Sequence, residues 1–529
     1  MISNNPLVNR AWGAAGGIMR KLVIFSAVFV PLMASAPANA SWFEAKSAHF
    51  VIYADEAPTP LEAFATRLEK FDKAVRILRE MDDPPLGDGG RVTVYVLPST
   101  DAVSKLAVGK RSPIAGFYIP RASGSVAFVP KKSGSGQIWD LDADTVFFHE
   151  YSHHLQLQNT DAALPPWLIE GFAEFYSTAD FQRDGSVRLG TPANHRVAGL
   201  YLLPKPAMEV LLGGGMKKPT GEQLEAFYGW SWVLTHYLTF APERKGQLSR
   251  YAEAIRRGDD LMKAATDAFG DLKQLNQDTD RYLHVNRFRY LQVNDPELNR
   301  TTVSVRPLRA GEAALMPARI RSTRGVDKKA APEIAAQIRA TAATYPTDPV
   351  VQRALAEAEF DVHNYPASEQ AAERALAIDP KFEEALIYKG RAEMELAASN
   401  PKADWTAIRD NFLKANRLET EDAEPLMLYY ESFGRAGVRP PVNASEGLLY
   451  ALVLAPQDKS LRMMAVEQLI EDGKFAEAKN TLGPVAFDPH SSGGRDQARK
   501  IMNALAAKDA KSALAALSAP APDDDDTGE

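Results

Sequence analysis

Residues 144–158 read Asp-Thr-Val-Phe-Phe-His-Glu-Tyr-Ser-His-His-Leu-Gln-Leu-Gln, and residues 166–175 read Pro-Trp-Leu-Ile-Glu-Gly-Phe-Ala-Glu-Phe. The first stretch follows aspartates that can cap a helix, so we expect it to be helical. His149 and His153 are four residues apart and would share one helix face, where both imidazoles can bind one metal ion. Glu150 stands next to the first of them and could act as the base for a water molecule on that ion.

Two further carboxylates extend this group. Glu170 and Glu174 are also four residues apart on a predicted helix, so one can ligate the ion while the other orients an imidazole. The chain has no cysteine, which excludes disulfide scaffolds, thiol nucleophiles and cysteine-ligated zinc. Two histidines and one carboxylate leave the fourth position of a zinc ion open to water, as hydrolysis requires.

The combination of H-E-x-x-H at 149–153 with W-L-x-E-G-x-A-E at 167–174 resembles the gluzincin clan of zinc metallopeptidases. It is most similar to the peptidase-MA-like bacterial proteins in which such a domain precedes tetratricopeptide (TPR) repeats. The resemblance implies a thermolysin-like α+β domain, one zinc ion and hydrolysis of peptide bonds. It also implies that Glu170 is the third zinc ligand and that Glu174 hydrogen-bonds to His149.

A third segment begins at Phe227-Tyr228-Gly229-Trp230 and resembles a helix start in the aminopeptidase branch of the clan. The resemblance implies that the hydroxyl of Tyr228 stabilises the oxyanion of the tetrahedral intermediate. The residues alone fit a tyrosine packed in an aromatic helix equally well. The G-x-M-E-N element that anchors a free amino terminus is absent, so we expect an endopeptidase rather than an aminopeptidase.

Three other histidines are less favoured candidates for a role at the metal site or in substrate binding. His154 is rotated by about 100° from the neighbouring ligand, so it would lie beside the site or face solvent. His195 and His236 could bind substrate, or they could be ordinary surface or core residues. In the resemblance, a strand at 126–129 or at 116–118 would be the sheet edge that pairs with an extended peptide.

The ends of the chain have their own composition. Arg20 and Lys21 precede an apolar run and an Ala38-Asn39-Ala40 sequence, which predicts a signal peptide over residues 1–40, with Met19 as an alternative start. An uncleaved anchor is the alternative, but the run is shorter than the ~20 residues that a spanning helix needs. We therefore expect an exported protein, in a bacterial periplasm, with no stable membrane span after cleavage. Residues 518–529 hold four consecutive aspartates and predict a disordered acidic tail.

Between these ends we expect three parts. Residues 41–295 should form the α+β peptidase domain, with strands near 49–53 and 91–97 and later helices. Residues 296–330 are rich in Arg, Thr and Pro and predict a linker or a small docking element. Residues 331–517 are Ala-rich and helical. Prolines recur there at 349, 380, 425, 456 and 489, a spacing near that of TPR-like repeats. A generic stack of α-hairpins is the alternative.

Two functions from different classes remain open. The first is an exported zinc metallopeptidase that acts on a peptide or protein, with repeats that bind a protein partner. The second is a non-catalytic periplasmic TPR adaptor with a structural or vestigial metal site. Retention of Glu150 favours the enzyme, because a structural site needs no base. With 61 basic against 68 acidic residues, a nucleic-acid partner is disfavoured.

Overall fold

The computed structural model describes residues 42–83, 86–112, 114–131, 141–159, 164–216, 219–486 and 492–519. The described residues form one compact unit. The expected signal peptide and the run of aspartates in the expected tail lie outside the described residues. Within the described part of the chain, no helix is both long and apolar enough to cross a membrane.

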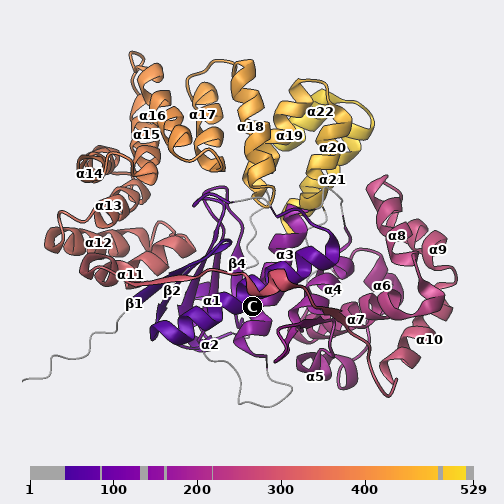
Figure 1. Ribbon diagram of the computed structural model, residues 1–529. Coiled ribbons are helices and arrows are strands. Elements are labelled where there is room, and N and C mark those ends of the chain that lie inside the picture. The colour runs from indigo at the N-terminus through magenta and orange to yellow at the C-terminus, as the bar shows by residue number, and fades with distance from the viewer. Residues whose placement is uncertain are drawn as a thin grey trace, which may run out of the picture. The chain divides into compact units, whose positions relative to one another are not determined.

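The first part of this unit is built on a six-stranded mixed sheet (Figure 1). Its strands lie in the order β4, β5, β3, β2, β1, β9, with β2, β3 and β5 parallel and the other pairs antiparallel. Their bounds are β1 Trp42–Lys46, β2 Phe50–Asp55, β3 Val92–Leu97, β4 Phe117–Ile119, β5 Val126–Pro130 and β9 Ser304–Pro307. The predicted runs at 116–119 and 125–129 form a hairpin, and β4 is the edge strand.

Alternating side chains on β2 divide the core between the two faces of the sheet. Phe50 and Ile52 are buried on one face against helices α1 (Pro58–Arg79) and α3 (Ala143–Gln158). Tyr53 faces the other way and joins Tyr95 and Phe128 in a stack. That aromatic face is covered by α2 (Thr100–Val108) and by α11 (Ala310–Arg324). The sheet is therefore buried on both faces.

The helices that carry the candidate site follow the sheet. Helix α3 begins where Asp142 accepts a hydrogen bond from the backbone N–H of Thr145, so the capping prediction is confirmed. Helix α4 (Pro166–Ser177) packs on both α3 and α7 (Gly221–Phe240). Among the described residues, this region also contains five further helices and a small three-stranded sheet. The helices are α5 Val197–Tyr201, α6 Met208–Leu212, α8 Gln247–Arg256, α9 Leu261–Phe269 and α10 Leu272–Leu283. The strands are β6 Asp180–Phe181, β7 Val187–Leu189 and β8 Leu291–Val293.

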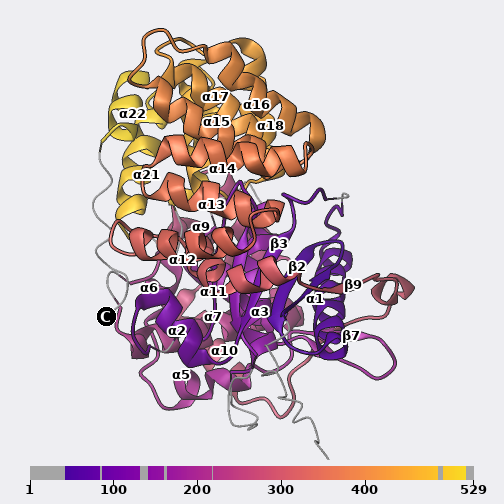
Figure 2. The same ribbon diagram turned by 90° about the vertical axis from the view of Figure 1, so that its left-hand side faces the viewer.

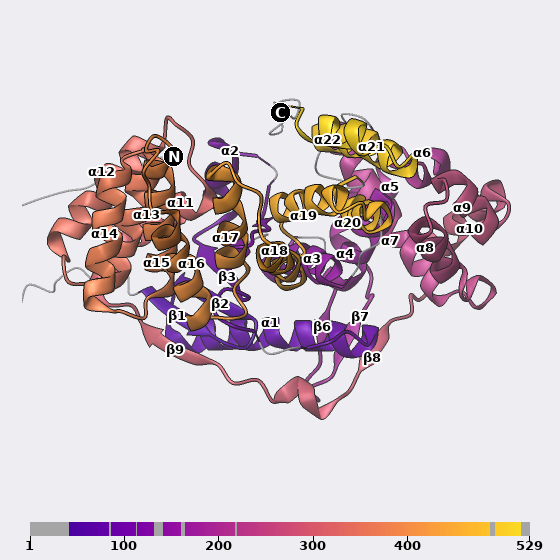
Figure 3. The ribbon, with the colours of Figure 1, turned by 90° about the horizontal axis from the view of Figure 1, so that it is seen from above.

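Residues 296–330, expected to be a linker or a small docking element, belong to the folded unit and contain β9 and α11. The segment after β8 runs along α1 and ends in β9, which pairs with β1 at the far edge of the sheet (Figure 3). Arg306 on β9 holds both carboxylate oxygens of Glu44 at 2.9 and 2.7 Å and also binds Glu312 of α11. A four-residue strand whose partner lies 262 residues away leaves no periodic pattern in the sequence.

The rest of the chain is a helical-repeat solenoid. Consecutive helices pack on one another and form a curved row that begins with α11 (Figures 1 and 2). The later helices are α12 Ala331–Thr344, α13 Pro349–Asp361, α14 Tyr365–Ile378, α15 Glu383–Ala397, α16 Trp405–Leu418, α17 Ala423–Arg435, α18 Val442–Leu454, α19 Lys459–Glu471, α20 Phe475–Ala486, α21 Ser492–Ala506 and α22 Ala510–Leu517. The long interval between prolines 380 and 425 includes the extended turn between α15 and α16.

The solenoid and the sheet region share buried contacts. Met316 and Ile320 of α11 pack on the aromatic face of the sheet, while Leu315 of the same helix packs among the repeats. Farther along, the turn between α18 and α19 meets the β4–β5 turn, where Asp458 accepts a hydrogen bond of 2.7 Å from the backbone N–H of Ala122. The repeats are therefore part of the same folded unit as the sheet.

Candidate metal centre

Three potential ligand atoms converge between α3 and α4. Nε2 of His149 lies 3.2 Å from Nε2 of His153, and Oε2 of Glu170 lies 3.4 and 3.6 Å from these two nitrogens. All three residues belong to one potential metal-binding group, and Glu170 is completely buried. The structure thus brings together the three residues that the sequence selected as ligands.

This geometry fits a zinc ion. Bonds of about 2.0–2.2 Å from zinc to nitrogen and oxygen in a tetrahedron separate the ligand atoms by about 3.4 Å. The three observed separations lie on both sides of that value. A carboxylate with two imidazoles is also a donor set that zinc accepts, although other divalent ions can use it.

Glu174 stands behind the ligands and is enclosed by basic side chains. Its Oε1 lies 3.1 Å from Nδ1 of His149 and 2.5 Å from Nη2 of Arg196, and its Oε2 lies 2.9 Å from Nε2 of His195. Burial alone would raise the pKa of Glu174, but Arg196 and the two histidines outweigh it and hold the pKa well below its usual range. Glu174 is therefore a carboxylate that orients the ring of His149.

The ligands carry an excess of negative charge. Burial lowers the pKa of His149, but the carboxylates of Glu170 and Glu174 outweigh burial and raise the pKa to about 10. The surroundings of the imidazole thus favour a positive charge at this point. A divalent cation at the same point would be bound by the carboxylate of Glu170 and would leave the imidazole neutral, as ligation requires.

Glu150 and Tyr228 lie at the same centre. The ring of Tyr228 is 6.1 Å from the ring of His149 and lies under the guanidinium of Arg196 at 5.0 Å. Burial, the carboxylate of Glu170 and, more weakly, that of Glu150 raise the pKa of Tyr228 well above its usual range. Tyr228 is therefore a neutral hydroxyl that can donate a hydrogen bond.

The other histidines have different positions. His195 contacts Glu174, so it belongs to the centre without being one of the three ligands. Nδ1 of His154 lies 2.7 Å from the hydroxyl of Tyr118 on β4, and burial lowers the pKa of His154 to about 3. His236 is fully buried in α7, and its Nε2 donates to the carbonyl oxygens of Gly190 and Arg289. His154 and His236 are structural residues.

A second group of potential ligands surrounds His49 at the start of β2. Its Nδ1 lies 2.8 Å from Glu69 and 3.6 Å from Asp72, and its Nε2 lies 2.9 Å from Asp83. Arg76 binds the same Asp72 at 2.8 Å. Both imidazole nitrogens already have carboxylate partners, so this group is a buried ion network that joins β2 to α1.

Sequence reasoning missed Arg196 and Tyr118. Arg196 connects Glu174, Glu225 and the ring of Tyr228, but it lies on a short segment with no pattern that relates it to α4. The hydroxyl of Tyr118 lies 2.8 Å from Oγ of Ser125, which in turn accepts a hydrogen bond of 3.2 Å from Gln457 of the solenoid. A chain of polar contacts thus extends from the repeats to His154, next to a ligand.

No family model matches the chain, and no curated protein matches it either. Among solved structures, the chain is similar to the crystal structure of the yeast Tom70, with 12% identity and a TM-score of 0.25. That similarity covers 65% of this chain and 70% of the other. The TM-score is too low for the similarity to bear on fold or function, and the helical-repeat architecture rests on the helix packing described above.

Proposed function

We propose that the protein is an exported zinc-dependent metallopeptidase of the gluzincin type, with a thermolysin-like fold in residues 41–295. The observation that carries the proposal is the convergence of His149, His153 and Glu170 with a carboxylate, Glu150, one residue after the first ligand. A structural zinc site uses all four positions for protein ligands, whereas this group supplies three. Glu174 and Arg196 hold the ligands in place from behind.

Each residue has a separate task in this proposal. Zinc, when bound, polarises the scissile carbonyl and lowers the pKa of water. Glu150 takes a proton from the attacking water and passes it to the leaving amine. Tyr228, whose raised pKa keeps its hydroxyl protonated, donates a hydrogen bond to the developing oxyanion.

The substrate in this proposal is an extended peptide within a protein. Strand β4 is at the edge of the sheet, and its Tyr118 contacts helix α3 through His154. A peptide that adds to this edge would gain backbone hydrogen bonds and lie along the helix that bears the ligands. This arrangement favours an endopeptidase over an enzyme that captures a free amino terminus.

The repeats provide a second function in the same chain. Solenoids of this kind present an extended surface to other proteins, so we propose that they bind a protein partner or deliver the substrate. If the centre holds no metal, the chain is instead a periplasmic adaptor. Export itself is tested by sequencing the amino terminus of the secreted chain, which should begin at Ser41.

Metal content and hydrolysis test the proposal together. Purified wild type should hold one zinc per chain by mass spectrometry, and His149→Ala and Glu170→Ala should lose it. Glu150→Gln should keep the zinc and lose hydrolysis of fluorescein-labelled casein. His284→Ala replaces an exposed histidine and should change neither property. A folded wild type without stoichiometric metal, or a Glu150→Gln protein that still cleaves, would contradict the proposed enzyme.

A further inference from the structure

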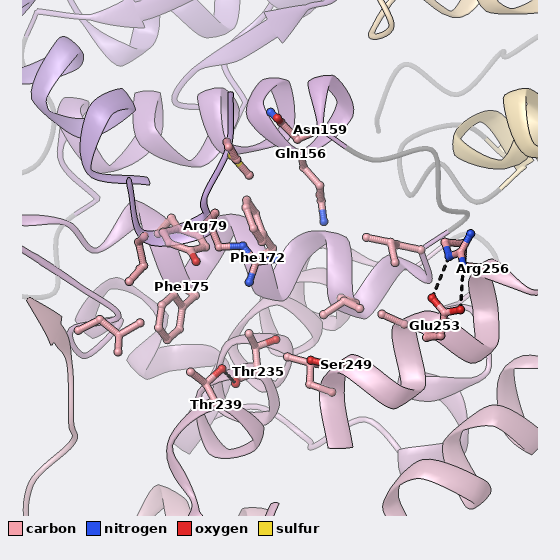
Figure 4. A pocket seen from close by; sticks show the side chains of 18 residues that line it. Arg79, Gln156, Asn159, Phe172, Phe175, Thr235, Thr239, Ser249, Glu253 and Arg256 are labelled. Carbon is pink, nitrogen blue, oxygen red and sulfur yellow. Dashed lines mark hydrogen bonds and ion pairs between the residues drawn. The ribbon is translucent and has the colours of Figure 1, made fainter. Parts of the chain in front are cut away.

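A cavity of about 510 Å³ lies beside α4, and none of the three potential metal ligands lines it. The ends of α1 and α3 and parts of α4, α7 and α8 surround it (Figure 4). Its floor is apolar, with Leu168, Phe175 and Tyr176 buried. The volume is within the range of about 300–1,000 Å³ that is typical of small-molecule sites.

Two polar side chains that line this cavity lack a hydrogen-bond partner within the described residues, Gln156 and Thr235, whose Oγ1 is fully buried. Gln156 of α3 is only 7% exposed, and its side chain makes no hydrogen bond within the described part of the chain. Figure 4 shows its amide pointing from α3 into the space between the helices. An amide that faces the cavity without a protein partner is available for a hydrogen bond to a ligand atom.

The charge at the cavity is also unbalanced. Arg79, at the end of α1, is exposed at the mouth, lies over the ring of Phe172 at 5.9 Å, interacts with the hydroxyl of Tyr176 and has no ion-pair partner in the described residues. Arg256, at the same mouth, is paired with Glu253 through two contacts of 2.8 Å. One positive charge therefore remains beside an apolar chamber.

We propose that this cavity binds an amphipathic monocarboxylate with an unbranched aliphatic chain. The chain fills the apolar floor, the carboxylate pairs with Arg79, and the amide of Gln156 donates a hydrogen bond to a carboxylate oxygen. A neutral chain of the same length would gain no ion pair with Arg79, and a cationic one would be repelled by it. The site is separate from the metal centre and does not depend on the proposed peptidase activity.

Calorimetric titration of the full mature chain with decanoate tests this site, with decanol as the neutral probe. One decanoate should bind per chain, at least about tenfold more tightly than decanol, because the carboxylate gains a charged hydrogen bond. Arg79→Gln and Gln156→Leu should each weaken decanoate binding by about tenfold. Ser249→Trp, which places an indole at the exposed mouth, should abolish binding of both probes.

Arg256→Gln is the matched control, because it removes an arginine from the same mouth that already has a partner. Its affinity for decanoate should equal that of wild type. The proposal would be overturned if decanoate did not bind saturably, or if decanol bound as tightly as decanoate. It would also be overturned if Arg79→Gln and Arg256→Gln weakened decanoate binding equally. Zinc content should be unchanged in all of these variants, so failure here is distinguishable from failure of the metal centre. Circular dichroism confirms that each variant is folded.

Discussion

Glu174 is the residue that most directly fixes the orientation of the ligand His149 in the metal centre. It contacts His149, His195 and Arg196 with its two oxygens and is completely buried. Glu174→Gln keeps the size of the side chain but removes the negative charge that orients the ligand. We expect the affinity for zinc to fall by about 10–100-fold, as measured by competition with a chelator.

Glu225 provides the control for that substitution. It binds the same Arg196 at 2.6 Å but is more exposed, and within the described residues it makes no ion pair with a metal ligand. Glu225→Gln should therefore change the zinc affinity by less than about threefold. Equal losses of zinc affinity in Glu174→Gln and Glu225→Gln would show that Arg196, rather than Glu174, orients the site.

His49 predicts a pH-dependent stability. Burial lowers its pKa, but Asp72, Asp83 and Glu69 outweigh burial and raise it to about 10, above the ordinary value of 6.5. A raised folded-state pKa stabilises the protein fully below the unfolded-state value, and this contribution is lost as the pH rises toward 10. His49→Ala should lower the free energy of unfolding by about 3–5 kcal/mol at pH 6.

Urea denaturation at pH 6 and pH 9 measures this difference. The difference in free energy of unfolding between wild type and His49→Ala should be smaller at pH 9, because the stabilising charge of His49 is then partly lost. His284→Ala, at an exposed position, should show no such gap at either pH. A gap for His49→Ala that widens with pH would contradict the assignment of a charged imidazole.

The residues of the centre differ in how far the sequence reveals them. His149 and His153 could be identified because helical geometry fixes the relation between positions four apart. The same spacing marked Glu170 and Glu174 as a pair, and the resemblance to the gluzincin clan implied that Glu170 is the ligand of the two. Arg196 could not, since its relation to Glu174 is created only when separate helices pack.

At the scale of elements, the crossing of α4 and α7 depends on Gly171. A Cβ at this position would overlap Oγ1 of Thr235 and lie 2.6 Å from the backbone oxygen of Ser231. Gly171→Ala should therefore separate the two helices and lower the free energy of unfolding by about 1–3 kcal/mol. Thermal unfolding and zinc content should both report the change, because Glu170 is the preceding residue.

Gly447, within α18, is the matched control. A Cβ there would meet only Leu426 at 3.6 Å, which is ordinary contact. Gly447→Ala should stabilise the protein by about 0.5–1 kcal/mol, because alanine loses less entropy in a helix. If both alanine variants were stabilised, close packing of α4 on α7 would not explain the glycine.

Helices and strands could be predicted from the sequence where they are long and carry a capping residue or an apolar pattern. Helix α3 has a capping aspartate and an apolar stripe, and the strands with four or more apolar residues were also apparent. Helix α11 was not apparent, because its apolar residues face two different cores, and the short strand-like stretch at β9 gave no sign of its partner β1. A helix that is buried on two sides lacks the single stripe that marks an amphipathic helix.

At the scale of the whole molecule, the sheet region should not fold without the start of the solenoid. A chain that ends at residue 295 lacks β9 and α11, so it exposes the edge of β1 and the aromatic face around Tyr53. We expect it to aggregate or to unfold without cooperativity in a thermal melt. A chain that ends at residue 379 keeps both elements and should melt cooperatively. A stable, monomeric 41–295 chain would contradict this expectation.

The pairing of β1 with β9 also sets a time order on folding. Glu44 and Arg306 are 262 residues apart. At a synthesis rate of about 5–20 residues per second, β1 waits roughly 10–50 s before its outer partner exists. Throughout that interval its edge can pair with other chains, so this nascent protein is a natural client for a holding chaperone.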